Sequence, residues 1–493
     1  MKRSLYSYTL LSAFLFGLFH TTAWGQQNFV TLKEGEYEIK KATEPQIKDA
    51  IISGRFATTY ESEHSGTIGG RTGAGQSVYE FELGFRSNIH DYVSMNATLA
   101  NFSDITGDQT TGYQSRYPLE EGDSTNDTGM NLIFKEAFLE YNHNPSAVLR
   151  IGRHKFNIGD RQGLVYKGIA SGFSQTCNVG TWCYLIGSAK LGKGIDDNLM
   201  FAQLTYPVYE SGKEVKDFFS NEFHQDNGLY IELFRNFYRG SQIPLAKYGG
   251  RTGNGSAYHA TTDTGKKVYF DNKKIEYFGL NGTWYLPQFQ FHLNYIANAG
   301  FRDYWAGNGL DDYLGHSHVT GHLWYSRNSY DWEENVRLSY DYFSATGNKD
   351  PSHAATLWKH DLTAYTEVQK GYFGDALIYF QGQQQTGQSH SVSNLSFQST
   401  SLRYRSMNQP WQLDLSLYSF HKTNPVLDEN NQLVQAIGRE VDVLYSNQIE
   451  KNLTFKFGYA VFMPEAAFSR QDNETATQGK TFSSVSTQLN YHF

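Results

Sequence analysis

The chain has 493 residues, a formal net charge of −8 and two cysteines. The mild negative charge argues against nucleic acid as a partner, and beyond the first segment no apolar run is long enough for a membrane-spanning helix. Mean hydropathy is below zero, yet aromatic residues reach 16%, with 35 Tyr and 34 Phe. An aromatic excess in a polar chain is typical of a membrane barrel with an apolar outer face, a polar lumen and aromatic rims.

The first 25 residues are expected to be a secretory signal peptide. Met1-Lys2-Arg3 is a basic start, an apolar run follows over Leu10 to Phe19, and Ala23 and Gly25 are small residues at the positions that a signal peptidase reads. The apolar run is too short for a membrane anchor, which needs roughly 20 residues. Residues 26–48 are charged and lack a strand pattern, so we predict a short periplasmic segment there and a barrel over 49–493.

Strands are predicted by alternation of apolar and polar side chains. The last segment is the clearest, with Val485, Thr487, Leu489, Tyr491 and Phe493 on one face and polar residues on the other. The pattern recurs along the chain in segments of about ten residues, the length that a tilted strand needs to cross a bilayer. Charged residues on the polar face cannot face lipid cheaply, so that face must line the lumen. The predicted fold is all-β, a transmembrane antiparallel up-and-down β-barrel.

The predicted strand number is 18, with 20 as the alternative. Short and long links alternate, as periplasmic turns and outer loops do. If residues 182–190 belong to a long loop over 157–195, which could fold inward and narrow the lumen, the count is 18. If they form a strand, closure needs another strand near 243–248 and the count is 20.

The C-terminal residues and the two cysteines carry further predictions. The alternating Leu489, Tyr491 and Phe493 resemble the terminal signal by which outer-membrane barrels are recognised for assembly, which makes the barrel assembly machinery and outer-membrane lipids the expected partners. Cys177 and Cys183 would meet an oxidising compartment after secretion, and we predict that they form a disulfide that closes a small loop.

One strand and its surroundings resemble the alginate-export family of outer-membrane porins. The matching motifs are Leu149-Arg150-Ile151-Gly152-Arg153 with Gly159-Asp160-Arg161, the preceding segment 134–141, and the closing segments 440–442, 451–454 and 458–462. The resemblance covers about a quarter of the chain and implies an 18-stranded channel that passes an anionic polysaccharide through an Arg-rich constriction. It makes Arg150, Arg153 and Arg161 the candidate constriction residues, with Glu136 and Glu140 as acids on the neighbouring strand.

Alternation alone adds other lumenal residues. The candidates for pore lining and selectivity are Arg337, Asp341, Arg403, Arg405 and Asp414, and the same alternation turns Arg55, Glu80, Glu82, Arg86, Glu440, Asp442 and Lys456 inward. Each of these either selects ions or pairs across the wall and supports the barrel. Alternation also places Arg150 and Arg153 on opposite faces, and only a bulge near Gly152 would bring both into the lumen.

These features favour a passive channel for saccharides or small anionic solutes, with polysaccharide export as the form that the resemblance implies. The alternative is a barrel with a blocked pore that acts as a surface binding or adhesion protein. None of the Ser and His residues lies in a nucleophile motif, so an enzyme is not expected. No cofactor is expected, and the closely spaced His316, His318 and His322 are expected to be solvated rather than to bind a metal.

Overall fold

The structure is a computed structural model of the 493-residue chain. It describes residues 48–64, 75–104, 133–144, 146–159, 163–179, 182–191, 198–217, 223–240, 258–261, 267–306, 312–348, 361–365, 368, 376–381, 392–427, 432–468 and 481–493. The predicted signal peptide, Arg161 and the segment 243–248 lie outside the described residues. The first strand begins at Lys48, within one residue of the predicted start of the barrel.

The described residues form strands and one short π-helical turn. The first strands are β1 (Lys48–His64), β2 (Gly75–His90), β3 (Val93–Asp104), β4 (Ile133–Asn144), β5 (Ala147–Ile158), β6 (Tyr166–Val179), β7 (Trp182–Lys190), β8 (Asn198–Lys216), β9 (Phe223–Gly240) and β10 (Tyr258–Thr261). They are followed by β11 (Lys267–Tyr285), β12 (Phe289–Ala306), β13 (Asp312–Glu333), β14 (Val336–Ala345), the π-helical turn η2 (Leu377–Gln381), β15 (Leu395–Arg405), β16 (Trp411–Leu427), β17 (Leu433–Glu450), β18 (Leu453–Pro464) and β19 (Phe482–His492).

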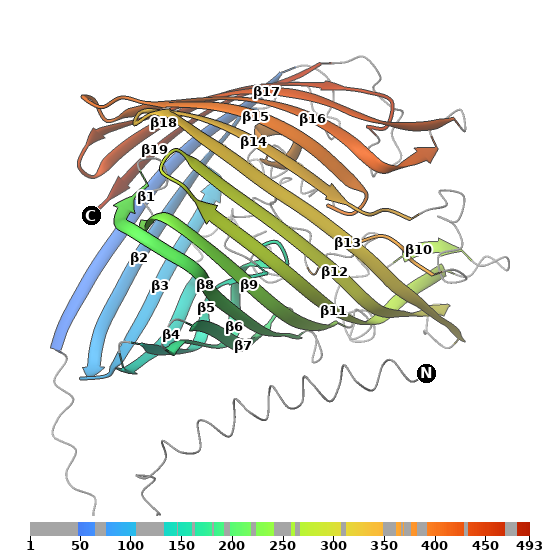
Figure 1. The fold of residues 1–493 in the computed structure, drawn as a ribbon, viewed down its shortest axis with the longest axis horizontal. Helices are drawn as coiled ribbons and strands as arrows, with labels where there is room; N and C mark the ends of the chain where they lie inside the picture. Colours follow the sequence, from blue (N-terminus) through green and yellow to red (C-terminus); the bar gives the residue numbers. More distant parts are fainter. Residues whose placement is uncertain are drawn as a thin grey trace, which may run out of the picture. The chain divides into compact units, whose positions relative to one another are not determined.

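The strands close into a barrel. Each strand pairs antiparallel with the next, and β1 pairs with both β2 and β19, so the ring has no free edge. The short β10 does not add a strand to the ring. β9 pairs with β11 as far as Lys273, and β10 pairs with the remaining end of β11, from Tyr269 to Lys267. The closed ring therefore has 18 strands, and Figure 1 shows their common slant.

The strand number is confirmed, but one reason given for it is wrong. Residues 182–190 form β7 rather than part of a long loop, and the expected loop over 157–195 is mostly the hairpin of β6 and β7. Both strands carry glycines on the lumenal face, such as Gly172 and Gly187, where the alternation expects polar side chains, and this weakens the pattern. Gly172 packs against the backbone of β7, where a Cβ would come within 2.0 Å of the Ser188 carbonyl oxygen.

The two ends of the barrel differ in their links. At one end, here called the turn end, the strands are joined by links such as Asp91–Tyr92, Glu334–Asn335 and Lys451–Asn452. At the other, here called the loop end, the link between β14 and β15 spans residues 346–394. This asymmetry is that of outer-membrane barrels, in which the turn end is periplasmic and the loop end faces outward.

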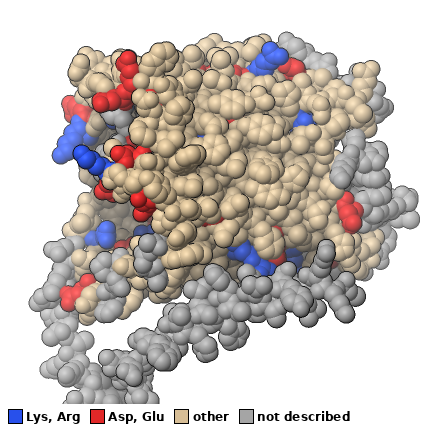
Figure 2. Space-filling model, viewed as in Figure 1, with Lys and Arg blue, Asp and Glu red and all other residues tan. Residues whose placement is uncertain are grey.

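The outer wall is apolar. Exposed large side chains such as Leu280, Leu338 and Leu415 alternate with inward polar ones, and Figure 2 shows a broad uncharged surface with charges gathered toward its margins. At the turn end, outward aromatic rings pack in pairs, including Trp182 with Tyr206, Phe289 with Tyr330 and Tyr404 with Trp411. A wall of this kind is stable only in lipid, because in an aqueous environment its large apolar area would be exposed to water.

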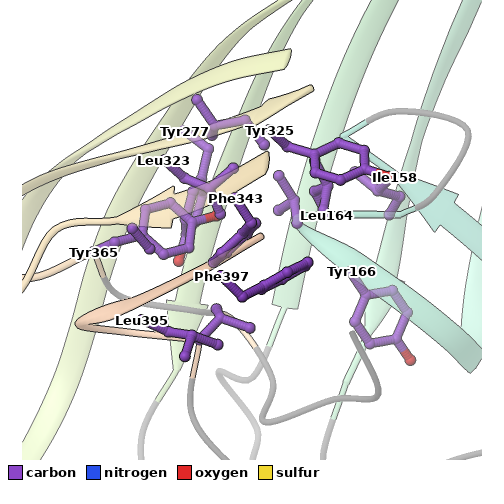
Figure 3. Packing of buried hydrophobic residues seen from close by; sticks show 14 of the residues in the cluster. Ile158, Leu164, Tyr166, Tyr277, Leu323, Tyr325, Phe343, Tyr365, Leu395 and Phe397 are labelled. Carbon is purple, nitrogen blue, oxygen red and sulfur yellow. The ribbon is translucent and has the colours of Figure 1, made fainter. Parts of the chain in front are cut away.

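The apolar core lies inside the barrel. Buried side chains that point inward from β5–β9 and β11–β18 form one cluster with residues of three links at the loop end. In Figure 3, Tyr365 from the β14–β15 link lies near Leu323 and Phe343 of the wall, and Ile158 and Leu164 approach the same cluster from the side of β5. In the part of the chain that is described, no member of this cluster comes from β1–β4 or β19.

Candidate functional site: the lumen of the barrel

Part of the β14–β15 link lies along the wall and then packs into the lumen. Leu362 forms a parallel bridge with Val319 of β13, taking the place that β14 leaves when it ends. The backbone N–H of Leu362 donates to the His318 carbonyl at 2.7 Å, and the Thr320 N–H donates to the Leu362 carbonyl at 2.7 Å. Tyr365, three residues on, is buried with its ring 6.2 Å from that of Tyr277. We call the described residues 361–365 and 376–381 the inward segment.

Two carboxylates hold the second half of the inward segment. Glu440 accepts the backbone N–H groups of Ile378 at 2.6 Å and Tyr379 at 2.9 Å, and Asp442 accepts that of Leu377 at 3.0 Å. Both acids project inward from β17 and are buried. Three consecutive N–H groups are thus paired with carboxyl oxygens of two buried acids.

The ring of Tyr379 adds packing to this anchor. It stacks on Phe420 at 4.1 Å and lies 5.9 Å from Phe462. Burial and the nearby Glu440 carboxylate raise the pKa of Tyr379, so its hydroxyl stays neutral at physiological pH.

Three asparagines tie the base of the β14–β15 link to β16. Asn424 donates its side-chain N–H to the carbonyls of Gly347 at 2.8 Å and Asn348 at 3.1 Å, and its backbone N–H donates to the Asn394 side chain at 2.7 Å. The Asn348 side chain accepts the N–H groups of Thr363 and Ala364 at 3.2 Å each. Asn394 itself has φ of 58°, a left-handed conformation that asparagine tolerates better than most residues.

A second, shorter link also projects inward. After β5 the chain turns through Gly159, whose carbonyl accepts a hydrogen bond from the Asn281 side chain of β11 at 3.3 Å. Leu164 and Val165 in the same link are buried in the apolar cluster. The expectation of an inward loop over 157–195 is therefore right only for this turn.

Charged side chains line the lumenal face of β1–β4 and of β5 around Arg150, and we call this face the charged wall. The part of the charged wall nearer the loop end is a cluster of two cations and two acids. Arg55 contacts Glu80 at 2.8 Å and Glu82 at 3.3 Å, and Lys135 contacts the same two carboxylates. A bulge between β3 and β4 turns Lys135 inward beside the paired acids. The four charges balance, so this cluster supports the wall more than it attracts ions.

The part of the charged wall nearer the turn end carries an excess of positive charge. Glu140 of β4 lies between Arg150 of β5, at 2.9 Å, and Arg86 of β2, at 3.5 Å. The two arginine side chains are 47% and 56% exposed, whereas that of Glu140 is 16% exposed. Because the guanidinium groups outnumber the carboxylate and reach the open lumen, this trio presents net positive charge to a passing solute.

Lumenal charges on the opposite side mostly form pairs. Arg327 donates two hydrogen bonds to Asp341, at 2.7 and 2.8 Å. Arg337 contacts Asp331 at 2.6 Å and Asp217, from the β8–β9 turn, at 2.9 Å. Arg403 contacts Asp414 at 3.1 Å, and by register Arg405 lies on the same face opposite Gln412.

The predicted constriction residues do not come together. Arg150 faces the lumen, but Arg153 stands opposite Ala137 and Ser171 on the outer face, and its Nε donates to the Lys135 carbonyl at 3.2 Å. The bulge that would have turned it inward is absent from the described β4–β5 and β5–β6 pairing around Gly152, whose φ of 128° is accommodated without a register shift. Arg153 is therefore not a pore-lining residue. Glu136 lies opposite Thr98 on the lumenal face, next in sequence to Lys135 of the four-charge cluster.

The predicted disulfide is wrong. Cys177 and Cys183 are both free thiols in the β6–β7 hairpin. Cys177 stands opposite Tyr184, and Cys183 stands opposite Asn178, so the two side chains project to opposite faces of the sheet. Cys183 shares the lumenal face with Gln203 and Phe234, whereas Cys177 shares the outer face with the exposed Phe173.

The C-terminal residues lie on the outer face of the closing seam. Leu489 and Tyr491 pair with Thr58 and Phe56 of β1, and the backbone groups of Phe493 and Gly54 exchange hydrogen bonds of 2.9 and 3.0 Å. Their role as an assembly signal stays a prediction.

Comparison with known proteins supports the fold and leaves the family open. No protein-family model matches the sequence, and no curated protein matches it closely enough to count, so the resemblance to the alginate-export family is not confirmed. Solved structures do match. Acinetobacter baumannii OccAB4 has a TM-score of 0.52 at 11% identity, and Pseudomonas aeruginosa OpdK, solved with vanillate, has 0.50 at 9%. Each comparison covers 91% of this chain and 99% of the other.

A closed 18-strand ring with an apolar outer wall is suited to a lipid bilayer. The chain is an integral outer-membrane β-barrel. Among the described residues, no helix of this barrel has the length and apolar character needed to span a bilayer.

Proposed function

We propose that the barrel is a passive channel for small anionic solutes that move along the charged wall. The observation that carries this proposal is the trio of Arg86, Glu140 and Arg150, with two half-exposed guanidinium groups around one carboxylate. Cations that line a pore favour anions by offsetting the cost of their partial dehydration. OpdK, which shares the fold, was solved with vanillate, a small aromatic carboxylate, and this is consistent with the proposed class of solute.

The packing of the lumen favours small solutes over a polymer. The inward segment and the apolar cluster occupy the loop-end half of the lumen beside β11–β18, which restricts passage to the side of the charged wall. Export of an anionic polysaccharide, which the alginate-export resemblance implies, needs a wider continuous path. The same packing also favours a second candidate function, that of a blocked barrel that binds a partner at the cell surface.

Uptake into proteoliposomes tests the proposal and separates the two candidates. Labelled gluconate and glucose are similar in size, differ in charge and do not cross lipid, so wild-type barrels should admit gluconate faster. Each of Arg86→Gln and Arg150→Gln should lower gluconate uptake about fivefold, the effect of about 1 kcal/mol from one charge at close range in water. Glucose uptake should change little.

Arg153→Gln is the matched control, because it removes the same charge from the same strand on the outer face. Equal losses in Arg150→Gln and Arg153→Gln would contradict the proposed path. No uptake of either solute would favour the blocked barrel.

A further inference from the structure

Three cations form a row on the outer wall near the loop end. Lys190 of β7, Arg239 of β9 and Lys274 of β11 lie in one line of paired residues, in which Lys190 stands opposite Asn198, Asn198 opposite Arg239, and Arg239 opposite Lys274. We call them the basic row. Each is preceded or followed in sequence by a residue buried in the lumenal cluster, namely Ala189, Tyr238 and Ile275. Alternation then fixes the three cations on the face toward lipid.

The basic row lies at the height of lipid headgroups. Leu229 and Trp284 are paired at the turn-end side of the same two strands, and Arg239 and Lys274 each lie ten residues further along. Ten residues of a strand tilted by about 40° rise about 25 Å, which is also about the height of the apolar band of such barrels. Cations at this height face the polar groups of the loop-end leaflet rather than its acyl chains.

The surface below the basic row suits acyl chains. Leu233, Phe278 and Leu280 are exposed apolar side chains on the same face of β9 and β11. One further cation, Arg235, lies over the Phe278 ring at 5.2 Å and is neutralised by Glu276 at 2.9 Å. Lys274 lies over the Phe301 ring of β12 at 5.0 Å, which keeps its ammonium group close to the wall.

Two like charges stand side by side at one rung of the patch. Arg239 and Lys274 are directly opposite each other, so an anionic group that contacts one of them can also contact the other. The patch offers apolar contact below and several positive charges above, so its ligand needs both acyl chains and a multiply charged headgroup.

We propose that the basic row and the apolar surface beneath it bind a phosphorylated glycolipid of the outer leaflet. The phosphates would contact Lys190, Arg239 and Lys274, and the acyl chains would cover Leu233, Phe278 and Leu280. This assignment is independent of what passes through the lumen, because the site lies on the opposite face of the wall.

Native mass spectrometry of the detergent-solubilised full-length barrel tests the proposal, with lipid A as the probe. Wild-type protein should retain phosphorylated lipid A. Arg239→Gln/Lys274→Gln should weaken its affinity about thirtyfold, since each basic side chain near an anionic surface contributes about fivefold. Heat-modifiable gel mobility and uptake of gluconate should be unchanged, which shows that the variant barrel is folded.

The control is Arg439→Gln. Arg439 is an exposed, outward arginine at the loop end of β17, ion-paired with Glu465 at 3.6 Å and far from the basic row in strand order. An equal loss in this variant, or equal retention of dephosphorylated lipid A by the wild type, would overturn the proposal. Displacement of lipid A by inorganic phosphate at similar concentration would also overturn it, by pointing to a soluble anion.

Discussion

Arg150 and Arg153 show how three residues of spacing separate a lumenal side chain from an outer one. In an unbroken strand an odd spacing reverses the face, and Gly152 does not shift the register here. The alternation in the sequence was therefore a better guide than the resemblance, which grouped both arginines in one constriction. Lys135 shows the opposite case, since a bulge that no local pattern marks turns it inward beside Glu80 and Glu82.

The two cysteines give a direct test of which face is wet. In Cys177→Ser the remaining Cys183 faces the lumen, and in Cys183→Ser the remaining Cys177 faces lipid. A charged, water-soluble thiol reagent should label the first variant in proteoliposomes and leave the second largely unlabelled, as mass spectrometry of the intact chains would show. Equal labelling of both variants would contradict the assigned faces. A wild-type chain whose thiols react only after reduction would contradict the absence of a disulfide.

Gly54 gives a test of the closing seam. A Cβ at this position would come within 2.0 Å of the Phe493 ring, so Gly54→Ala should displace the ring and destabilise the barrel by about 1–3 kcal/mol. The matched control is Gly282→Ala on β11, where a Cβ would meet nothing within 4 Å. The midpoint of urea unfolding, followed by gel mobility, should fall in the first variant only. A fall of equal size in both would show that Phe493 does not lie over Gly54.

At the scale of elements, the sequence predicts strands better than it predicts what fills the barrel. Each strand reports its own faces through alternation, but the anchoring of η2 depends on Glu440 and Asp442, some 60 residues away. One local signal is present: Ala376-Leu377-Ile378-Tyr379-Phe380 is the longest apolar run in the link over 346–394. An apolar run in a link needs a place to be buried, and the lumen is the available one.

Removal of the Glu440 carboxylate should loosen the inward segment. Glu440→Ala leaves the N–H groups of Ile378 and Tyr379 without their acceptor, and each buried donor left unsatisfied costs about 1–3 kcal/mol. Single-channel recordings should show higher conductance and more open-channel noise than the wild type. Glu440→Gln, which keeps an acceptor, should have a smaller effect.

Glu465→Ala serves as the control for this measurement. Glu465 is an acid at the loop end whose described ion pair is with the outward Arg439. Its removal should leave conductance unchanged. Wild-type conductance in Glu440→Ala would mean that η2 does not limit the passage.

At the scale of the whole molecule, the closure of the barrel and its apolar outer wall follow from the alternation that repeats along the chain. Alternating segments predicted an antiparallel barrel of 18 strands, because lipid leaves no room for an open sheet edge. The side of the lumen that stays polar could not be predicted in this way. It is set by where three links pack against β5–β18, and this leaves β1–β4 and β19 outside the apolar cluster among the described residues.

The central claim is that the charged wall makes this barrel an anion-preferring pore. The most direct measurement is the reversal potential of the wild-type protein in a planar bilayer under a potassium chloride gradient. The excess of exposed guanidinium groups at Arg86 and Arg150 predicts measurable conductance and a reversal potential on the side of chloride. A preference for potassium, or no conductance in bilayers that contain correctly folded barrels, would contradict it.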